Sequence, residues 1–187
     1  MTPVGTFTSI AADDTIEIYN GVDFTNLLRS YGNSVSTTGV RPHGDKTTSI
    51  AVGAGVRAKF CRHTCPGNHV NSFDVVGPYN INDLDEMDNT ISNLVTNPYD
   101  ESDLTDARVQ LFGKADYACP YCGVFAVGEY LTADLYSNHI GNPGTTYAAK
   151  GIKVPSRMTA RVYPQDNYGG QEFVFDGPVT LQFADDN

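Results

Sequence analysis

Short stretches of alternating apolar and polar residues recur along the 187-residue chain. They occupy residues 15–19, 56–60, 107–112 and 160–163, and each one ends on an aromatic residue. Such alternation is typical of a β-strand with one face buried and the other in solvent. Turn-forming residues follow, such as the Asn-Gly pair at 20–21, and they favour a hairpin corner after the strand. The pattern predicts an all-β fold.

These strands belong to a longer repeat. Thr-Ser-Ile-Ala occurs at 8–11 and again at 48–51. The repeating units begin near residues 14, 56, 107 and 160. Their period is therefore roughly 40 to 50 residues, which accommodates the four strands of one Greek key. A single key cannot bury both of its faces, so we expect the keys to pair into β-sandwiches. This predicts four Greek keys in two domains, at 1–98 and 107–187, joined by a polar linker at 99–106.

Three further segments carry known motifs: YPQDNYGG at 163–170, VGEYLTADL at 127–135 and DNTISN at 88–93. They resemble the aromatic corner motif, the third-strand region of microbial members and the calcium signature N/D-N/D-x-x-S/T-S of the βγ-crystallin superfamily, in its microbial, non-lens type. The resemblance covers nearly the whole chain. It implies a two-domain, non-enzymatic β protein of a family that often binds Ca²⁺ in microbes and is structural in the lens.

The resemblance places calcium between the signature loop of one key and the corner loop of its partner. Carried over to the second key, the ligands are Asn89, the carbonyl of Thr90, and Ser92. The corner loop of the first key would add Asn20 and the carbonyl of Gly21. Proteins bind Ca²⁺ with six to eight oxygens, and carboxylates supply the charge. Few of these ligands are charged, so we expect weak binding.

The first key carries a poorer match to the signature. By the same correspondence its ligands are Asp45, Lys46 and Thr48, and the leading position is Gly44. The facing corner contains Arg62, whose fixed positive charge opposes a bound cation. We expect this site to be the weaker one. The alternative for both signatures is that their side chains close tight turns by hydrogen bonds to the backbone.

The last two keys depart further from the family pattern. In the third key, residues 146–151 stand at the signature without suitable ligand side chains, so we expect no site there. The fourth key stops before its signature and last strand, and residues 6–11 carry a matching segment. We expect residues 6–11 to supply that strand, in the same chain or in a neighbour, with Asp186 and Thr8 forming a split site. The alternative is a loose N-terminal arm.

The four cysteines form two close pairs, Cys61 with Cys65 and Cys119 with Cys122. A zinc site would suit this composition. However, the two pairs are far apart in sequence and fall in different predicted domains. We favour local disulfides or free thiols over zinc. A redox role is not indicated, because no βαβ unit surrounds the second pair.

Composition narrows the classes of partner. The chain has 12 Lys+Arg against 22 Asp+Glu, a formal net charge of −10, and no cluster of basic residues. Nucleic acids and anionic membranes attract positive charge, so neither is expected as a partner, whereas self-association is left open. No apolar stretch is long enough for a membrane span, and no signal peptide is visible. We expect a cytoplasmic protein, with secretion as the alternative.

Motifs for catalysis are missing from the sequence. It contains no nucleophile elbow, no HExxH, no P-loop and no dinucleotide fingerprint. The acidic run at 83–88 is typical of a solvated face or a short helical turn. We therefore predict a non-enzymatic structural or storage-type protein with weak or vestigial calcium binding. One alternative is a true calcium-binding module that the metal stabilises. Another is a secreted, disulfide-containing binding protein or toxin.

Overall fold

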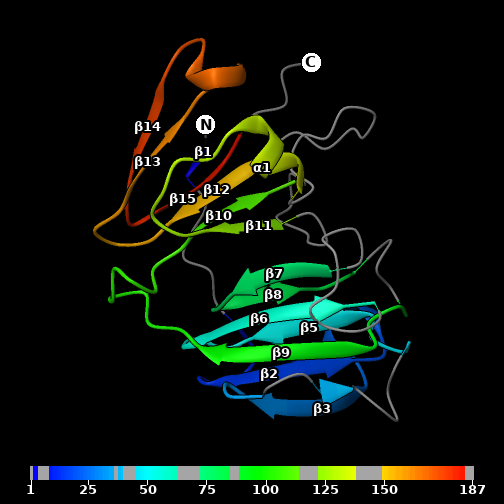
Figure 1. Cartoon of the computed structure of the whole chain (residues 1–187). Helices are drawn as coiled ribbons and strands as arrows, with labels where there is room; N and C mark the ends of the chain where they lie inside the picture. Colours follow the sequence, from blue (N-terminus) through cyan, green and yellow to red (C-terminus); the bar gives the residue numbers. More distant parts are fainter. Residues whose placement is uncertain are drawn as a thin grey trace. The chain divides into compact units, whose positions relative to one another are not determined.

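The computed structural model describes residues 2–3, 9–35, 38–39, 45–62, 72–84, 89–113, 122–137 and 149–183 (Figure 1). These residues form antiparallel β-sheets and one short α-helix, so the predicted all-β class is confirmed. The chain divides into two compact units. The N-terminal unit contains the described residues from 9 to 99, and the C-terminal unit contains residues 2–3 and those from 100 onward. Within this described part, no helix has the length and apolar character needed to cross a membrane.

Two four-stranded antiparallel sheets make up the N-terminal unit. The first has the order β3-β2-β5-β8, with β2 at Thr15–Tyr19, β3 at Leu27–Gly32, β5 at Ser49–Val52 and β8 at Tyr79–Ile81. The second has the order β4-β9-β6-β7, with β4 at Thr38–Gly39, β6 at Val56–Cys61, β7 at Ser72–Val76 and β9 at Asn93–Pro98. The third strands, β4 and β8, each lie in the sheet of the other key. This exchange joins two Greek keys into one sandwich.

Alternation along β2 and β6 builds the core of the N-terminal unit. Ile16 and Ile18 on β2 are fully buried, as is Phe60 on β6, while the residues between them are partly exposed. Phe60 also stacks on Phe73 of β7, with ring centroids 5.1 Å apart. Burying one such side chain stabilises the fold by about 1.5–3 kcal/mol. The strands predicted at 15–19 and 56–60 are confirmed.

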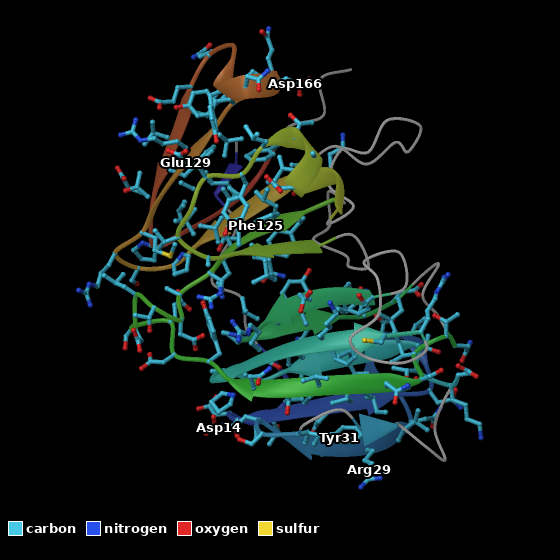
Figure 2. All side chains as sticks on the ribbon, viewed as in Figure 1. Asp14, Arg29, Tyr31, Phe125, Glu129 and Asp166 are labelled. Atoms are coloured by element: carbon cyan, nitrogen blue, oxygen red, sulfur yellow. The ribbon has the colours of Figure 1, made fainter. Side chains whose placement is uncertain are left out.

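The C-terminal unit has a five-stranded sheet and a two-stranded sheet. The larger has the order β1-β15-β12-β10-β11, with β10 at Val109–Phe112, β11 at Cys122–Phe125, β12 at Gly151–Val154 and β15 at Val179–Gln182. The smaller pairs β13 (Thr159–Val162) with β14 (Phe173–Asp176). Phe125 lies in the core of this unit with Leu111, Ile152 and Phe175 (Figure 2). The strands predicted at 107–112 and 160–163 correspond to β10 and β13.

A short helix stands where the sequence indicated a third strand at 127–135. The helix, α1, spans Thr132–Ser137, and residues 126–131 belong to no strand. Its start is set locally, because Asp134 Oδ2 accepts the N–H of Leu131 at 2.8 Å. A carboxylate that satisfies a free N–H in the first turn favours a helix start. The strand expected in this segment is therefore wrong.

The N-terminus supplies a strand to the C-terminal unit, but not the expected one. Strand β1 (Thr2–Pro3) pairs with β15, Thr2 opposite Gln182 and Pro3 opposite Leu181. We expected residues 6–11 to add a strand. Their described part, residues 9–11, lies in the N-terminal unit instead, where the N–H of Ile10 donates to Asn80 Oδ1 at 3.2 Å. Residues 6–8, the proposed split site at Thr8 and Asp186, and most of 146–151 lie outside the described residues.

Residues 100–106, expected to be part of a linker, form consecutive turns of the C-terminal unit. Ser102 donates to Asp100 Oδ1 from its N–H at 2.8 Å and from its Oγ at 2.7 Å. These hydrogen bonds lower the pKa of the Asp100 carboxyl. Asp106 Oδ2 accepts the N–H of Asp100 at 2.9 Å and closes the segment. The domain boundaries at 98 and 107 stay a prediction.

Candidate calcium-binding loops

The two signature loops of the N-terminal unit face each other in a symmetric arrangement. Asp45 and Asn89 hold equivalent positions, with φ of 58° and 53°. Asp and Asn are the residues that most readily adopt this left-handed conformation after glycine. The N–H of Asp45 donates to the carbonyl of Ile91 at 3.2 Å, and the N–H of Asn89 donates to the carbonyl of Thr47 at 3.0 Å. The start of each loop therefore lies against the middle of the other.

The hydrogen bonds between the two loops determine which of the predicted ligands lie close together. Ser92 Oγ donates to Asp45 Oδ1 at 3.0 Å. Sequence reasoning had assigned Ser92 to the same site as Asn89, whereas the structure brings it to Asp45. By the same symmetry, the hydrogen bond from Asn89 to Thr47 places Asn89 beside the residue that follows, Thr48.

The corner loops complete two groups of residues. The N–H of Thr48 donates to the carbonyl of Tyr19 at 2.8 Å, which brings Thr48 next to Asn20. The N–H of Ser92 donates to the carbonyl of Cys61 at 2.9 Å, which brings Ser92 next to Arg62. We define the Asn20–Asn89 group as Asn20, Thr48, Asn89 and the carbonyl of Thr90, the residue that follows Asn89. We define the Asp45–Ser92 group as Asp45, the carbonyl of Lys46, which follows Asp45, together with Arg62 and Ser92.

Ser49 fixes the corner loop that carries Asn20 and Gly21. Its Oγ donates to the carbonyl of Gly21 at 2.6 Å and accepts the N–H of Phe24 at 3.1 Å. The short 3-10 turn η1 (Val22–Phe24) follows, and Phe24 packs edge-on against Tyr19 with ring centroids 5.8 Å apart. The Gly21 carbonyl, a predicted ligand, is thus already engaged. Sequence reasoning missed Ser49, although the repeated Thr-Ser-Ile-Ala marked its position.

The same aromatic corner recurs in the C-terminal unit. Tyr163 and Tyr168 meet edge-on at 5.5 Å, and the turn η4 (Asp166–Tyr168) has positive φ at Asn167 and Tyr168, as η1 has at Asp23 and Phe24. Asp166 lies at the tip of this unit (Figure 2) and accepts a hydrogen bond from Thr132 at the start of α1. The corner motif read at 163–170 therefore forms a corner, tied here to a helix.

The Asn20–Asn89 group offers calcium suitable atoms but little charge. Its donors are amide, hydroxyl and carbonyl oxygens, which are hard ligands of the kind that Ca²⁺ takes. None of them is a carboxylate, and Asp88, the leading residue of the signature, lies outside the described residues. The donor atoms of this group are of the kind that Ca²⁺ takes, and no described side chain among them is charged.

The Asp45–Ser92 group does not fit a cation. Its one carboxylate, Asp45, already accepts the hydroxyl of Ser92. Its corner residue, Arg62, brings a permanent positive charge and donates from Nε to Thr90 Oγ1 at 3.3 Å. A second cation would be repelled by the guanidinium. The hydrogen bond between Ser92 and Asp45 joins the two loops within the chain.

The zinc hypothesis receives no support from the described residues. Cys61 is disulfide-bonded, and a disulfide sulfur does not act as the thiolate ligand that zinc requires. Across the ranges that the structure describes, no three His, Cys, Asp or Glu side chains gather into a metal cluster. The side chains of the other three cysteines lie outside these residues.

The paired keys, signature loops and aromatic corners define the class: the chain has the βγ-crystallin fold. No protein-family model and no curated protein matches the chain. Among solved structures, calcium-complexed Protein S is similar over 90% of this chain and 92% of its own, with 16% identity and a TM-score of 0.43.

Two single-domain structures are also similar. A βγ-crystallin domain of Abundant Perithecial Protein from Neurospora crassa, in its Ca²⁺-bound form, aligns with 48% of this chain and 94% of its own, at 17% identity and a TM-score of 0.40. A βγ-crystallin from an archaeon aligns with 44% of this chain and 96% of its own, at 21% identity and a TM-score of 0.32. These proteins are structural neighbours of the chain.

Proposed function

We propose that the protein is a non-enzymatic, structural or storage-type βγ-crystallin-like protein with one weak calcium site. The site is the Asn20–Asn89 group. The observation that carries the proposal is the crossed pairing of the two signature loops, held by the hydrogen bonds of Asp45 to Ile91 and of Asn89 to Thr47. The backbone groups that shape the site are thus already paired within the chain, so the fold does not depend on the metal.

The charges of the two groups support a single site. Calcium must lose part of its hydration shell on binding, and neutral oxygens compensate this loss less well than carboxylates. The Asn20–Asn89 group therefore corresponds to the weakest calcium modules, with dissociation constants of about 10⁻⁴–10⁻³ M. The Asp45–Ser92 group carries its own cation in Arg62 and takes no metal.

Overall charge supports a role that needs high concentration. The formal net charge of −10 is carried by a chain in which only 18% of residues are charged. Net charge far from zero keeps proteins apart in solution. We infer that the acidity serves solubility, since Asp45 is the one carboxylate in the two ligand groups defined above.

Calorimetric titration of Ca²⁺ into chelator-treated protein tests this proposal. Asn89→Gly removes the amide ligand, and glycine tolerates the positive φ at this position. Asp45→Gly is the matched control, because Asp45 has the equivalent conformation in the other loop. We expect one weak site in the wild type, none in Asn89→Gly, and one in Asp45→Gly. No binding in the wild type, or loss of binding in Asp45→Gly alone, would contradict the proposal.

The disulfide at Cys61 favours a second candidate, a secreted binding protein. Disulfides persist in oxidising compartments and are rare in the cytosol. Cys61 ends β6, next to Arg62 and the signature loops, so a covalent link there would hold a corner loop for recognition. Thiol counting on protein isolated from its native source under denaturing conditions distinguishes the two candidates. Unreacted cysteines support secretion, and four reactive thiols exclude it.

A further inference from the structure

Asn20 and Gly21 form the one Asn–Gly pair in the whole sequence. In such a pair the backbone nitrogen of glycine can attack the side-chain amide carbon of asparagine. A bond forms between this nitrogen and the carbon, the bond to the amide nitrogen breaks, and ammonia leaves. Water then opens the cyclic imide to aspartate or isoaspartate. Glycine allows this reaction best because it has no side chain to hinder the closure.

The structure leaves both reacting groups accessible. Asn20 is exposed, and its side-chain amide makes no hydrogen bond to the residues that the structure describes. The N–H of Gly21 likewise has no acceptor among them. Only the neighbouring atoms are held: the N–H of Asn20 donates to Asn26 at 3.1 Å, and the carbonyl of Gly21 accepts from Ser49. The pair is therefore anchored on both sides with its reactive atoms free.

Packing at the corner accounts for the glycine. A Cβ on Gly21 would lie 2.1 Å from Thr25 Oγ1. That hydroxyl donates to the carbonyl of Val22 at 3.0 Å and closes the turn η1. A side chain at position 21 would displace it. The contacts that build the corner thus keep the reactive glycine beside Asn20.

We propose that Asn20 is a site of spontaneous deamidation and that the resulting aspartate strengthens calcium binding at the Asn20–Asn89 group. This inference rests on the function proposed above. The reaction consumes one water, releases one ammonia and adds one negative charge to a chain of formal net charge −10. The new carboxylate enters a group whose donors are all neutral. The affinity for calcium would then rise in those molecules in which Asn20 has become aspartate.

Other asparagines lack this combination and serve as internal controls. Asn33 is followed by serine, and its amide nitrogen donates to Asp14 Oδ1 at 2.8 Å. Asp14 lies in the turn before β2 (Figure 2). Asn89 is followed by threonine, whose side chain hinders the closure.

Peptide mass spectrometry after incubation in mildly alkaline buffer tests the reaction. We expect conversion at Asn20 in the wild type and in Thr25→Ala, which keeps the Asn–Gly pair. The double variant Gly21→Ala/Thr25→Ala removes the glycine together with the hydroxyl that its Cβ would meet, and we expect conversion to slow at least about tenfold, relative to the single variant. Equal rates at Asn20 and Asn33, or no conversion at Asn20, would overturn the inference.

Calorimetry with Ca²⁺ tests the consequence separately. Asn20→Asp reproduces the aspartate product, and Asn20→Gln keeps a neutral amide in a longer side chain. We expect Asn20→Asp to bind at least about tenfold more tightly than the wild type, and Asn20→Gln no more tightly. If Asn20 deamidates while Asn20→Asp binds no calcium, the proposed function fails at this site. If Asn20→Asp binds tightly while Asn20 stays intact, the function stands and the modification fails.

Discussion

At the scale of single residues, Thr47 and Ile91 show how the two signature loops differ. They hold equivalent positions, and both are completely buried. The Thr47 hydroxyl has no hydrogen-bond partner among the described residues, whereas Ile91 places only carbon in its pocket. A buried hydroxyl without a partner costs about 1–3 kcal/mol of stability. Thr47 is therefore a weak point in the core of the N-terminal unit.

We predict that Thr47→Val stabilises the N-terminal unit by about 1 kcal/mol, because valine has the shape of threonine without the polar group. Chemical denaturation of both proteins measures the difference in the free energy of unfolding. Ile91→Thr, the reverse change at the equivalent position, should destabilise the unit. A loss of stability in Thr47→Val would mean that the hydroxyl is hydrogen-bonded in solution.

The charge of Arg62 leads to a prediction about the number of calcium sites. Arg62→Glu replaces the built-in cation of the Asp45–Ser92 group with a carboxylate. In chelator we expect this variant to lose about 1 kcal/mol, since the introduced carboxylate would repel Asp45. With Ca²⁺ added, the titration should show a second site that Arg62→Gln lacks. Equal calcium stoichiometry in the two variants would contradict the role that we give to Arg62.

Tyr19 makes the N-terminal unit sensitive to alkaline pH. Burial, the hydrogen bond to Glu17 and the charge of that carboxylate raise the pKa of Tyr19 from 10.0 to about 12. The neutral phenol is therefore favoured by folding. Its contribution to stability is complete below pH 10 and is lost as the pH rises through about 12.

We predict that the melting temperature of the wild-type N-terminal unit decreases as the pH rises from 10 to about 12. In Tyr19→Phe the decrease should be smaller. Calorimetric melts at pH 9 and above pH 11, about a unit either side of the ordinary tyrosine pKa, measure the effect. Tyr31, whose pKa burial also raises, accounts for a remaining decrease in the variant. An equal decrease in melting temperature in the wild type and in Tyr19→Phe would show that Tyr19 does not cause the loss of stability.

At the scale of elements, alternation identified the strands that have one face in the core. β2, β6, β10 and β13 all lie within the predicted stretches or within one residue of them. β5 escapes this signal because all four of its residues are buried, so no polar position alternates with the apolar ones. Alternation did not indicate α1 either, because the start of this helix depends on one capping carboxylate, that of Asp134.

Strand β1 was beyond prediction for a different reason. Two residues, Thr2 and Pro3, carry no periodic pattern, and their partner β15 lies near the other end of the chain. Such pairing depends on the three-dimensional fold, which sequence spacing does not report. The repeat at 8–11 pointed to the N-terminus but to the wrong segment of it, since Ala11 is buried beside Tyr19 and Ala51 in the N-terminal unit.

Deleting residues 1–3 tests the contribution of β1. We expect the C-terminal unit to lose about 1 kcal/mol, because cross-strand pairs contribute about 0.2–1 kcal/mol each. The N-terminal unit should keep its stability. Hydrogen exchange followed by mass spectrometry reads the two units separately, and β15 should exchange faster in the deletion. Unchanged protection of β15 would show that β1 contributes nothing.

At the scale of the whole molecule, the sequence located both signature loops but not their pairing. Asn89 and Asp45 were found because their segments resemble the calcium signature of the βγ-crystallin superfamily. Ser92 contacts Asp45 because the two loops face each other, and this arrangement forms only when the sandwich is assembled. The neutral character of the donors, by contrast, was readable from the sequence, and it leads to the same expectation of weak calcium binding.

Melting curves in chelator and in excess Ca²⁺ test most directly whether the chain folds without metal and binds calcium weakly at one site. We predict a cooperative transition in chelator and, at about ten times the dissociation constant, a gain of about 1.4 kcal/mol, or on the order of 5 °C, in the N-terminal unit. Identical curves would exclude the calcium site, and an unfolded protein in chelator would show that the metal, not the hydrogen bonds of the chain, holds the two loops together.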